Sequence, residues 1–281
     1  MKCTVAYMSG AGNLFTITNA AEVSPEDATR LAPFLCDARA TIGQRTDGLL
    51  IVAPDEQGIT VHFFNPDGST GMMCGNGARC AVRFALDSDI VPPSPTLRLN
   101  MAGTSYRALL DGDHITVIFP PPRTLTDPLT LTVGGHPLTC AYVDVGSDHV
   151  VISQHELVQW CAATGSPCAV TDVAPRIRWH SAFPRGCNVN LYHVHPDAVE
   201  LTTYERGVEA ITGACGTGAL ATAVVLWRRR EYPAQTIPIL PPSGRMLQVH
   251  IHTEGKTIAA LALGGPAEFI AHATVELPLQ G

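Results

Sequence analysis

Hydrophobic residues along the chain fall mostly into short runs of the kind that form β-strands. Each run is bounded by Gly, Pro or Asp, the residues that favour turns. The runs of the first half span residues 48–53, 59–64, 106–110 and 114–119. Those of the second half span residues 129–133, 139–145, 188–194, 198–204 and 246–252. This pattern predicts antiparallel or mixed sheets in both halves of the chain.

Two segments depart from the strand pattern in the same way. Residues 74–80 read CGNGARC and residues 214–220 read ACGTGAL, so in both a cysteine is followed by Gly-x-Gly. Apolar residues then recur at helical spacing, through Phe84 in the first segment and Trp227 in the second. The two cysteines lie about half a chain length apart. We therefore predict two similar halves, each offering one helix N-terminus to a shared cleft.

Prolines near the middle of the chain predict a domain boundary. Residues 120–122 are three consecutive prolines, and Asp127-Pro128 follows. Proline has no N–H to donate and restrains the residue before it, so we expect these positions to interrupt regular structure. The prediction is an N-terminal domain of residues 1–119, completed by a C-terminal strand at about 266–281, and a C-terminal domain of residues 120–265. A length of 281 residues fits two domains.

Composition narrows the class of protein. Hydrophobic residues make up 46% of the chain and charged residues 15%, which excludes disorder. A net charge of -7 argues against a nucleic-acid partner, so a small-molecule substrate is expected. The nine cysteines include no CxxC pair, which argues against a disulfide framework and favours a reducing cytoplasm. No apolar run fits a signal peptide or a spanning helix, so no membrane association is expected.

A cysteine at a helix N-terminus has a specific chemical use. The unpaired N–H groups and partial positive charge of the terminus stabilise both a thiolate and a bound carboxylate. Glycines at 75, 77, 216 and 218 allow a ligand to approach the backbone closely. Two thiols on opposite faces of one carbon could remove a proton from one face and return it on the other. The pair of motifs thus predicts racemisation without a cofactor.

Simpler uses of these residues were weighed against this prediction. A single Cys-Gly is more often a core residue before a turn, but two cysteines in matched contexts favour function. Neither cysteine has a second ligand at the short spacing of structural zinc, so no metal site is expected. His193 with His195, and His250 with His252, would share strand faces. We interpret both pairs as solvated surface rather than metal ligands.

The long motifs resemble those of the diaminopimelate epimerase family. NPDGS at residues 65–69 leads into MCGNGARC, and TYERGV at residues 203–208 leads into ACGTGA. The similarity extends to residues 10–13 and 183–188. It implies an α+β fold of two similar domains, each a mixed β-sheet wrapped around a central helix, with the active site in the cleft between them. It also implies a homodimer, no pyridoxal phosphate or other cofactor, and a role in lysine and peptidoglycan precursor synthesis.

The resemblance also implies roles for individual residues. Cys74 and Cys215 match the catalytic thiol pair. The carboxylate at the reacting carbon would be held by helix-terminal residues, with an asparagine near the same end of the substrate. These residues are Gly75, Asn76, Gly216 and Thr217, with Asn13 as the asparagine. The distal, non-reacting end would be recognised by Asn65, Asn188, Glu205 and Arg206.

Several positions depart from the family pattern and keep the substrate open. Ser147 and Asp148 stand where the family has Asn-Pro, Leu14 replaces an acidic residue, and Ile211 replaces a glutamate, with Glu209 nearby. The first hypothesis is epimerisation of LL- to meso-diaminopimelate. The second is racemisation of another amino acid such as histidine, whose basic side chain Asp148 could select. A non-catalytic amino-acid-binding protein is a remote third, and isomerases that use one carboxylate in place of the thiols are disfavoured.

Overall fold

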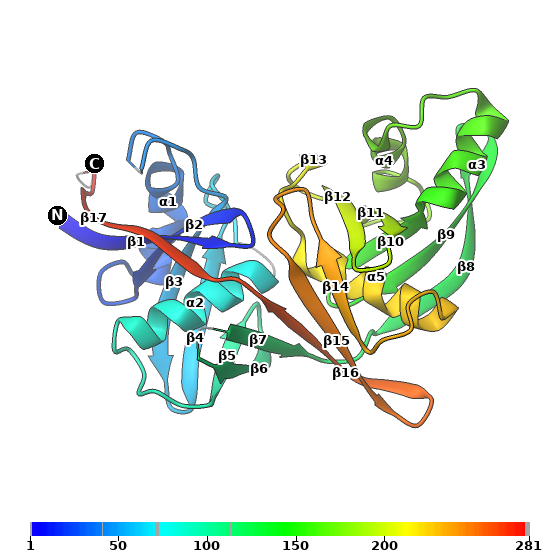
Figure 1. Cartoon of the computed structure of the whole chain (residues 1–281). Helices are drawn as coiled ribbons and strands as arrows, with labels where there is room; N and C mark the ends of the chain where they lie inside the picture. The colour runs from blue at the N-terminus through cyan, green and yellow to red at the C-terminus, as the bar shows by residue number, and fades with distance from the viewer. Residues whose placement is uncertain (1, 41, 71–72, 113, 279–281) are drawn as a thin grey trace. The chain divides into compact units, whose positions relative to one another are not determined.

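The chain folds into two compact units. The computed structural model describes residues 2–40, 42–70, 73–112 and 114–278. Unit 1 comprises Met1–Ile118 and Gly264–Gly281, and unit 2 comprises Phe119–Leu263 (Figure 1). None of the helices in these described ranges is long and apolar enough to cross a lipid bilayer.

Unit 1 is built on one mixed sheet. Its strands are β1 (Lys2–Gly10), β2 (Asn13–Asn19), β3 (Gly48–Asp55), β4 (Gly58–Phe64), β5 (Thr96–Met101), β6 (Thr104–Asp111), β7 (His114–Phe119) and β17 (Glu268–Glu276). They pair in the order β17–β1–β2–β3–β4–β5–β6–β7. The pairs β2–β3 and β4–β5 are parallel and the others antiparallel. Parallel neighbours need a crossover, and helices α1 (Pro25–Leu35) and α2 (Gly75–Asp87) provide the two crossovers.

Unit 2 repeats this plan. Its strands are β8 (Thr124–Val133), β9 (His136–Asp144), β10 (Asp148–Ser153), β11 (Asn188–Val194), β12 (Val199–Glu205), β13 (Ala210–Ile211), β14 (Thr236–Leu240), β15 (Leu247–Glu254) and β16 (Thr257–Gly265). From β9 to β15 the pairings alternate between antiparallel and parallel as they do from β1 to β6. The crossovers are α3 (Gln154–Thr164) with α4 (Val170–Arg178), and α5 (Gly216–Arg229). The shared topology confirms the predicted α+β fold of two similar domains.

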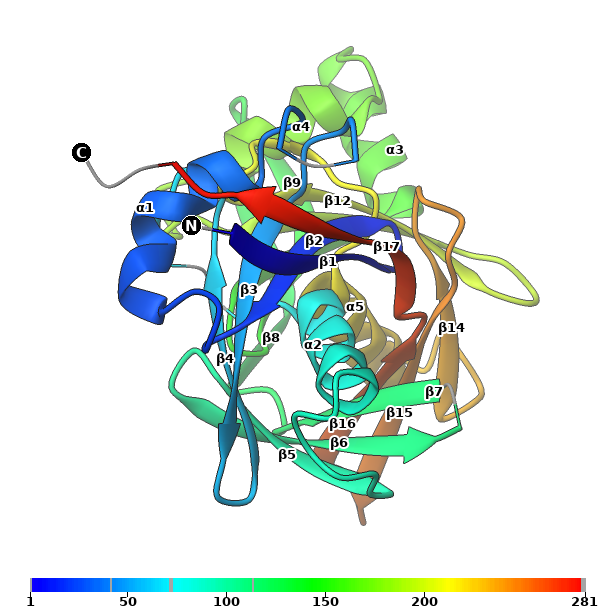
Figure 2. The ribbon, with the colours of Figure 1, turned by 90° about the vertical axis from the view of Figure 1, so that its left-hand side faces the viewer.

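Each unit has a central helix in contact with several strands. In unit 1, α2 contacts β1 to β5 (Figure 2). In unit 2, α5 contacts β9, β10, β11 and β15. Every α5 residue from Gly216 to Leu226 is buried, and so is every α2 residue from Gly75 to Val82. A helix buried on all sides needs small or apolar residues around its whole circumference, which GTGALATAVVL supplies.

The other helices close the two hydrophobic cores. Leu31 and Leu35 of α1 pack with buried residues of unit 1 such as Ile51 of β3. In unit 2, Trp160 of α3 and Ile177 of α4 pack over the sheet. These helices present one apolar stripe each, unlike the central helices.

The expected interruption at Asp127-Pro128 is wrong, because β8 runs through both residues. The register against β9 shifts between Thr126 and Leu129, so the ladder omits the proline that has no N–H to donate. The three prolines at 120–122 do lie in the connection between β7 and β8.

The second glycine of each Cys-Gly-x-Gly motif packs differently. A Cβ added at Gly218 would lie 2.5 Å from Asn190 Oδ1 of β11 and 2.8 Å from Thr203 Oγ1 of β12. At Gly77 the nearest atom would be a Leu50 methyl at 3.4 Å, an ordinary contact. Only Gly218 is therefore required by close approach of a neighbouring strand.

This difference predicts opposite effects of the same substitution. Gly218→Ala should lower the free energy of unfolding by roughly 1–3 kcal/mol, because two polar strand side chains must move. Gly77→Ala should leave it unchanged or raise it by about 0.5–1 kcal/mol, because alanine favours the helix. Urea unfolding followed by circular dichroism measures both. Equal destabilisation by the two substitutions would contradict the packing argument.

Candidate active site

The two motif cysteines have the same local geometry in their separate units. Cys74 is the N-cap of α2, with φ −119° and ψ 108°, and Cys215 is the N-cap of α5, with φ −122° and ψ 108°. In each motif Sγ accepts a hydrogen bond from the backbone N–H three residues on, at 3.4 Å. Thr217 Oγ1 lies 3.6 Å from Cys215 Sγ. A sulfur in this position caps orphan N–H groups, which favours its thiolate form.

Most other cysteines are core residues. Cys36, Cys80, Cys140 and Cys187 are fully buried. Burial raises the pKa of Cys36 to about 11 and that of Cys80, Cys140 and Cys187 to about 12, so all four are thiols at neutral pH. They follow the ordinary structural use of cysteine, whereas Cys74 and Cys215 cap helices.

Asn13 and Asn76, both predicted to lie at the reacting end of the substrate, are in contact in unit 1. Asn76 Nδ2 donates to Asn13 Oδ1 at 2.7 Å, and Asn13 Nδ2 donates to Asp47 Oδ2 at 3.3 Å. Gly10, at the end of β1, permits this approach, because a Cβ there would lie 2.6 Å from the Asn76 carbonyl oxygen. The β1–β2 turn and the first turn of α2 thus form one polar cluster in unit 1.

Asn65 lies in a tight loop after β4. Its Nδ2 donates to Ser69 Oγ at 2.9 Å, and its carbonyl accepts from Gly68 N. Gly68 has φ +87°, and a Cβ there would lie 2.1 Å from the Thr29 carbonyl oxygen of α1. The NPDGS motif therefore needs its glycine, because α1 packs directly against the loop.

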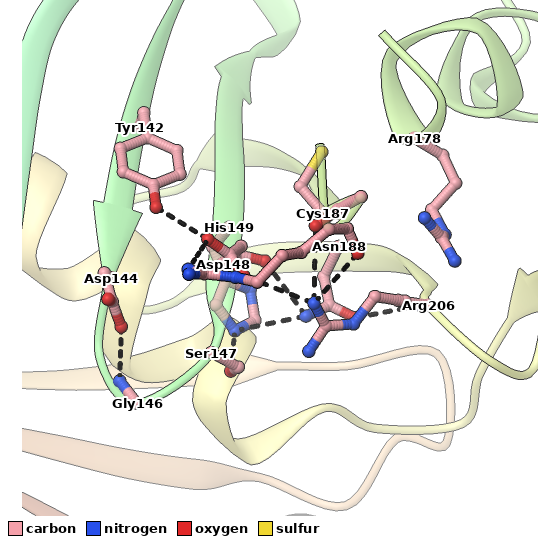
Figure 3. Close-up of polar contacts among 12 residues, drawn as sticks. Tyr142, Asp144, Gly146, Ser147, Asp148, His149, Arg178, Cys187, Asn188 and Arg206 are labelled. Carbon is pink, nitrogen blue, oxygen red and sulfur yellow. Dashed lines mark hydrogen bonds and ion pairs between the residues drawn. The ribbon is translucent and has the colours of Figure 1, made fainter. Parts of the chain in front are cut away.

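In unit 2, Asp148 holds two arginines (Figure 3). Arg206 Nη1 donates to Asp148 Oδ2 at 3.2 Å, and Arg185 Nη2 donates to Oδ1 at 2.8 Å. Tyr142 Oη donates to the same Oδ1 at 2.7 Å. The Asp148 side chain is 10% exposed, that of Arg206 18% and that of Arg185 73%. Arg206, predicted to recognise the distal end of the substrate, is thus paired within the protein.

The charge state of this cluster follows from its contacts. Burial alone would raise the pKa of Asp148, but hydrogen bonds from Arg185 and Tyr142 and the two arginine charges outweigh it and lower that pKa. Burial and the bond to Asp148 raise the pKa of Tyr142. At neutral pH the carboxylate is ionised and the phenol protonated, so the Asp148, Arg185 and Arg206 side chains carry a net single positive charge.

A neutral hydrogen-bonded network lies beside this cluster. Nε2 of the fully buried His149 lies 2.8 Å from Ser147 Oγ (Figure 3). On the other side of the ring, Asn190 Nδ2 lies 3.1 Å from His149 Nδ1. Thr203 Oγ1 donates to Asn190 Oδ1 at 2.9 Å. Burial lowers the pKa of His149 to about 3, so its ring is neutral. Asn190 and Thr203 are also the side chains that crowd Gly218, so the network packs against the first turn of α5.

Asn188, also predicted at the distal end, joins this distal cluster, whereas Glu205 accepts a hydrogen bond from a residue outside it. Asn188 Oδ1 accepts from the Arg206 backbone N–H at 2.9 Å, and Asn188 Nδ2 donates to the Asp148 carbonyl at 3.1 Å. Glu205 accepts from Thr212 Oγ1 at 2.8 Å. The structure therefore brings Asn188 and Arg206 together with Asp148 and places Glu205 next to Arg206 in the chain.

Two other positions at which the chain departs from the family pattern also lie in unit 2, whereas Leu14 lies on β2 of unit 1. Glu209 Oε1 accepts from Arg178 Nη2 at 2.8 Å, and Ile211 is 38% exposed. The ring centroids of His193 and His195 are 4.4 Å apart on an exposed strand face. Within the described ranges, no three side chains of His, Cys, Asp or Glu are grouped as a metal ion requires.

Several members of these clusters were not predicted as site residues. They are Asp47, Arg79, Tyr142, His149, Arg185, Asn190 and Thr203. Asn190 and Thr203 lie on adjacent strands, two residues from Asn188 and Glu205. Strand alternation from these predicted positions could have suggested them, because residues two apart share a face.

Comparison with known proteins identifies the family. The model of the diaminopimelate epimerase family matches residues 5–114. A diaminopimelate epimerase of Aquifex aeolicus is 31% identical over 89% of this chain and 91% of its own length. That of Chlorobaculum tepidum is 31% identical over 96% of this chain and its full length. The chain belongs to the diaminopimelate epimerase family and is an isomerase.

The solved structures agree at the level of the fold. A phenazine biosynthesis protein of the PhzF family from Bacillus anthracis superposes with a TM-score of 0.71 at 11% identity. The alignment covers 99% of this chain and all of that one.

The buried, neutral His149 predicts a specific dependence of stability on pH. Unfolding releases the ring to a pKa near 6.5, so the unfolded state takes up a proton that the folded state does not bind until about pH 3. His149 should therefore favour the folded state fully above pH 6.5 and progressively less as the pH falls towards 3. Relative to His149→Gln, wild-type stability should fall by up to about 1.4 kcal/mol per pH unit in this range.

Urea unfolding at a series of pH values measures the difference in the free energy of unfolding between wild type and His149→Gln. The titration of carboxylates affects both proteins equally and cancels in this difference. His193→Gln, at an exposed position, is the matched control and should show no such slope difference. Parallel pH profiles for wild type and His149→Gln would contradict the assignment of a neutral folded-state ring.

Proposed function

We propose that the protein converts LL-diaminopimelate to meso-diaminopimelate by a two-base reaction in which Cys74 and Cys215 exchange protons with one α-carbon. The observation that carries this proposal is the identical capping geometry of the two cysteines. Each sulfur sits at the N-terminus of a buried central helix and accepts an N–H bond at 3.4 Å. Membership of the diaminopimelate epimerase family supports the same assignment.

The reaction balances without any other reactant. One cysteine acts as a thiolate and removes the α-proton, becoming a thiol, while the electron pair of the C–H bond delocalises into the adjacent carboxylate. The other cysteine, a thiol, delivers its proton to the opposite face and becomes a thiolate. The product differs from the substrate only in configuration. The enzyme is left with the two protonation states exchanged, so the scheme needs no cofactor.

The helix termini supply the electrostatic part of this scheme. Negative charge moves onto the α-carboxylate as the proton leaves, and N–H groups aimed at that carboxylate stabilise the charge. In the proposed complex these groups belong to Gly75, Asn76, Gly216 and Thr217, and Asn13 lies at the same end. Asn65, Asn188, Glu205 and Arg206 recognise the distal amino acid group, with the carboxylate on Arg206.

The cellular setting follows from the same assignment. We infer that the protein acts in the cytoplasm as a homodimer on a free amino acid, without nucleic-acid or membrane partners, and serves lysine and peptidoglycan precursor synthesis. Light scattering coupled to gel filtration tests the dimer.

The two-base scheme predicts the behaviour of cysteine variants. In deuterated water, proton NMR of reduced enzyme with LL-diaminopimelate should show loss of the α-proton signal and appearance of the meso isomer. Cys74→Ala and Cys215→Ala should each lower the rate by at least about 1,000-fold, because each removes an acid–base group. Cys80→Ala, at a buried thiol one and a half turns along α2, is the matched control and should retain turnover.

Substantial turnover by either helix-capping variant would rule out the two-base scheme. Binding of the amino acid by wild type without any α-proton exchange would instead indicate a binding protein.

A second candidate function is favoured by the Arg206–Asp148 pair. An ionised carboxylate beside Arg206 reduces its attraction for a distal carboxylate. Asp148 would also be a partner for a basic side chain that displaced Arg185, whose side chain is 73% exposed. Racemisation of another amino acid, such as histidine, would use the same thiols with a different distal group.

Variants of the distal cluster distinguish the two substrates. If diaminopimelate is the substrate, Arg206→Met should raise its KM by at least about 100-fold, as expected for loss of a charge-assisted pair of about 3 kcal/mol. Asp148→Asn should then change KM less. If a basic amino acid is the substrate, Asp148→Asn should cause the larger loss. Arg185→Met removes an exposed arginine from the same carboxylate and is the matched control.

Exchange with L-histidine but not with LL-diaminopimelate would keep the thiol chemistry and overturn the first substrate assignment.

A further inference from the structure

Arg79 is a buried cation at the base of the reacting end of unit 1. Its residue is 0% exposed, the largest among the fully buried side chains. The guanidinium points back along α2, where Nη1 donates to the Gly75 carbonyl at 3.3 Å and Nη2 donates to Asn76 Oδ1 at 2.8 Å. Nε is buried without a partner, and among the described side chains no carboxylate pairs with this arginine.

Such a buried charge destabilises the folded state unless an anion or enough hydrogen-bond acceptors lie nearby. Burying an arginine removes its hydration, and an apolar side chain of similar size would avoid that cost. Two neutral acceptors compensate it only in part. Anions that would complete the balance are a thiolate at Cys74, directly before the first turn of α2, and a carboxylate bound at that turn.

The arginine also fixes the direction of a hydrogen-bonded chain. Because a guanidinium only donates, the amide of Asn76 must turn Oδ1 towards it and Nδ2 away from it. Asn76 Nδ2 then donates to Asn13 Oδ1, and Asn13 Nδ2 donates to Asp47 Oδ2. The chain runs from a buried cation to an exposed carboxylate, and each link orients the next. Both asparagines belong to the proposed substrate-binding set.

The other ionisable groups around Arg79 do not neutralise it. Burial lowers its pKa to about 10, so it is charged at neutral pH. Cys80, on the same helix, has a pKa of about 12 and stays neutral. The charge of Glu268, on β17, acts on Cys80 from an exposed position, and Asp47 lies at the far end of the asparagine chain.

We propose that Arg79 is a positioning residue for the reacting end of the site, whose buried charge favours the thiolate of Cys74 and whose hydrogen bonds orient the amides of Asn76 and Asn13. This inference rests on the proposed function for its role in turnover. Its effect on the thiol is a property of unit 1 alone and exists without substrate.

The rate at which iodoacetamide alkylates Cys74 tests the proposal without substrate. Mass spectrometry follows the peptide across pH 5–10 in the full-length protein. Arg79→Met should lower the rate at pH 7 at least ten-fold and move the profile to higher pH, leaving the plateau rate at high pH unchanged. Arg79→Gln should do the same, because it keeps polar atoms but loses the charge. Arg79→Lys, which keeps the charge, should stay within about three-fold of wild type.

Two controls separate a charge effect from damage to the fold. Arg83→Met removes another arginine of α2, which lies about 13 Å from Cys74 along the helix axis and about 6 Å farther than Arg79, and should leave the profile unchanged. Alkylation of the exposed Cys168 of unit 2 should be the same in every variant. If Arg79→Met does not fold, Arg79→Gln and Arg79→Lys still give the comparison.

A wild-type Cys74 profile in Arg79→Met or Arg79→Gln would overturn the proposal, as would an equal shift in Arg79→Lys. Turnover separates this result from the proposed function. If the variants shift the pH profile of Cys74 alkylation but the wild type exchanges no α-proton, the effect of Arg79 on the Cys74 thiol is retained and the proposed substrate is rejected. In an active enzyme, Arg79→Met should lower kcat at least ten-fold more than Arg83→Met does.

Discussion

The first turn of a buried helix leaves backbone N–H groups that water cannot reach, and the structure depends on how those groups are satisfied. In both central helices the sulfur of the N-cap cysteine satisfies one of these groups, because it accepts a hydrogen bond from the backbone N–H three residues on. In the proposed complex the remaining N–H groups of the first turn bind the carboxylate of the substrate. Because the buried parts of both helices consist mostly of small and apolar residues, strands can enclose them.

The two units support their capped helices by different means. In unit 1 the buried cation Arg79 donates a hydrogen bond to Asn76 in the first turn of α2, and Asn76 in turn donates one to Asn13. In unit 2 the first turn of α5 packs against a neutral network of Asn190, Thr203 and His149. The same strand topology thus carries two electrostatic environments, one charged and one neutral. A third environment, the Asp148 carboxylate between Arg185 and Arg206, contains Arg206, a residue of the proposed distal site.

Local signals in the sequence account for much of the fold and for the thiol pair. The Cys-Gly-x-Gly motifs locate both central helices, and the turn-bounded runs locate strands such as β3, β7 and β11. The capping box of α3, Ser153 with Glu156, is a further local signal in the sequence that marks the start of a helix. The resemblance placed Arg206 at the distal end, but its pairing and that of Arg185 with Asp148 were beyond sequence reasoning, because the two arginines reach Asp148 from 37 and 58 residues away. The buried position of Arg79 could not be predicted for another reason: its spacing is that of an ordinary exposed helix face, and only tertiary packing buries it.

The pairing of β1 with β17 has a consequence for how the chain is made. Lys2 lies opposite Glu276, so the first and last strands of the protein are neighbours in one sheet. A ribosome releases β1 long before β17, and unit 1 lacks its β17 strand until that segment has been made. Unit 2 is continuous from Phe119 to Leu263 and can complete its sheet earlier. The topology therefore allows unit 2 to finish folding before unit 1, the reverse of the usual order in which the N-terminal domain is first.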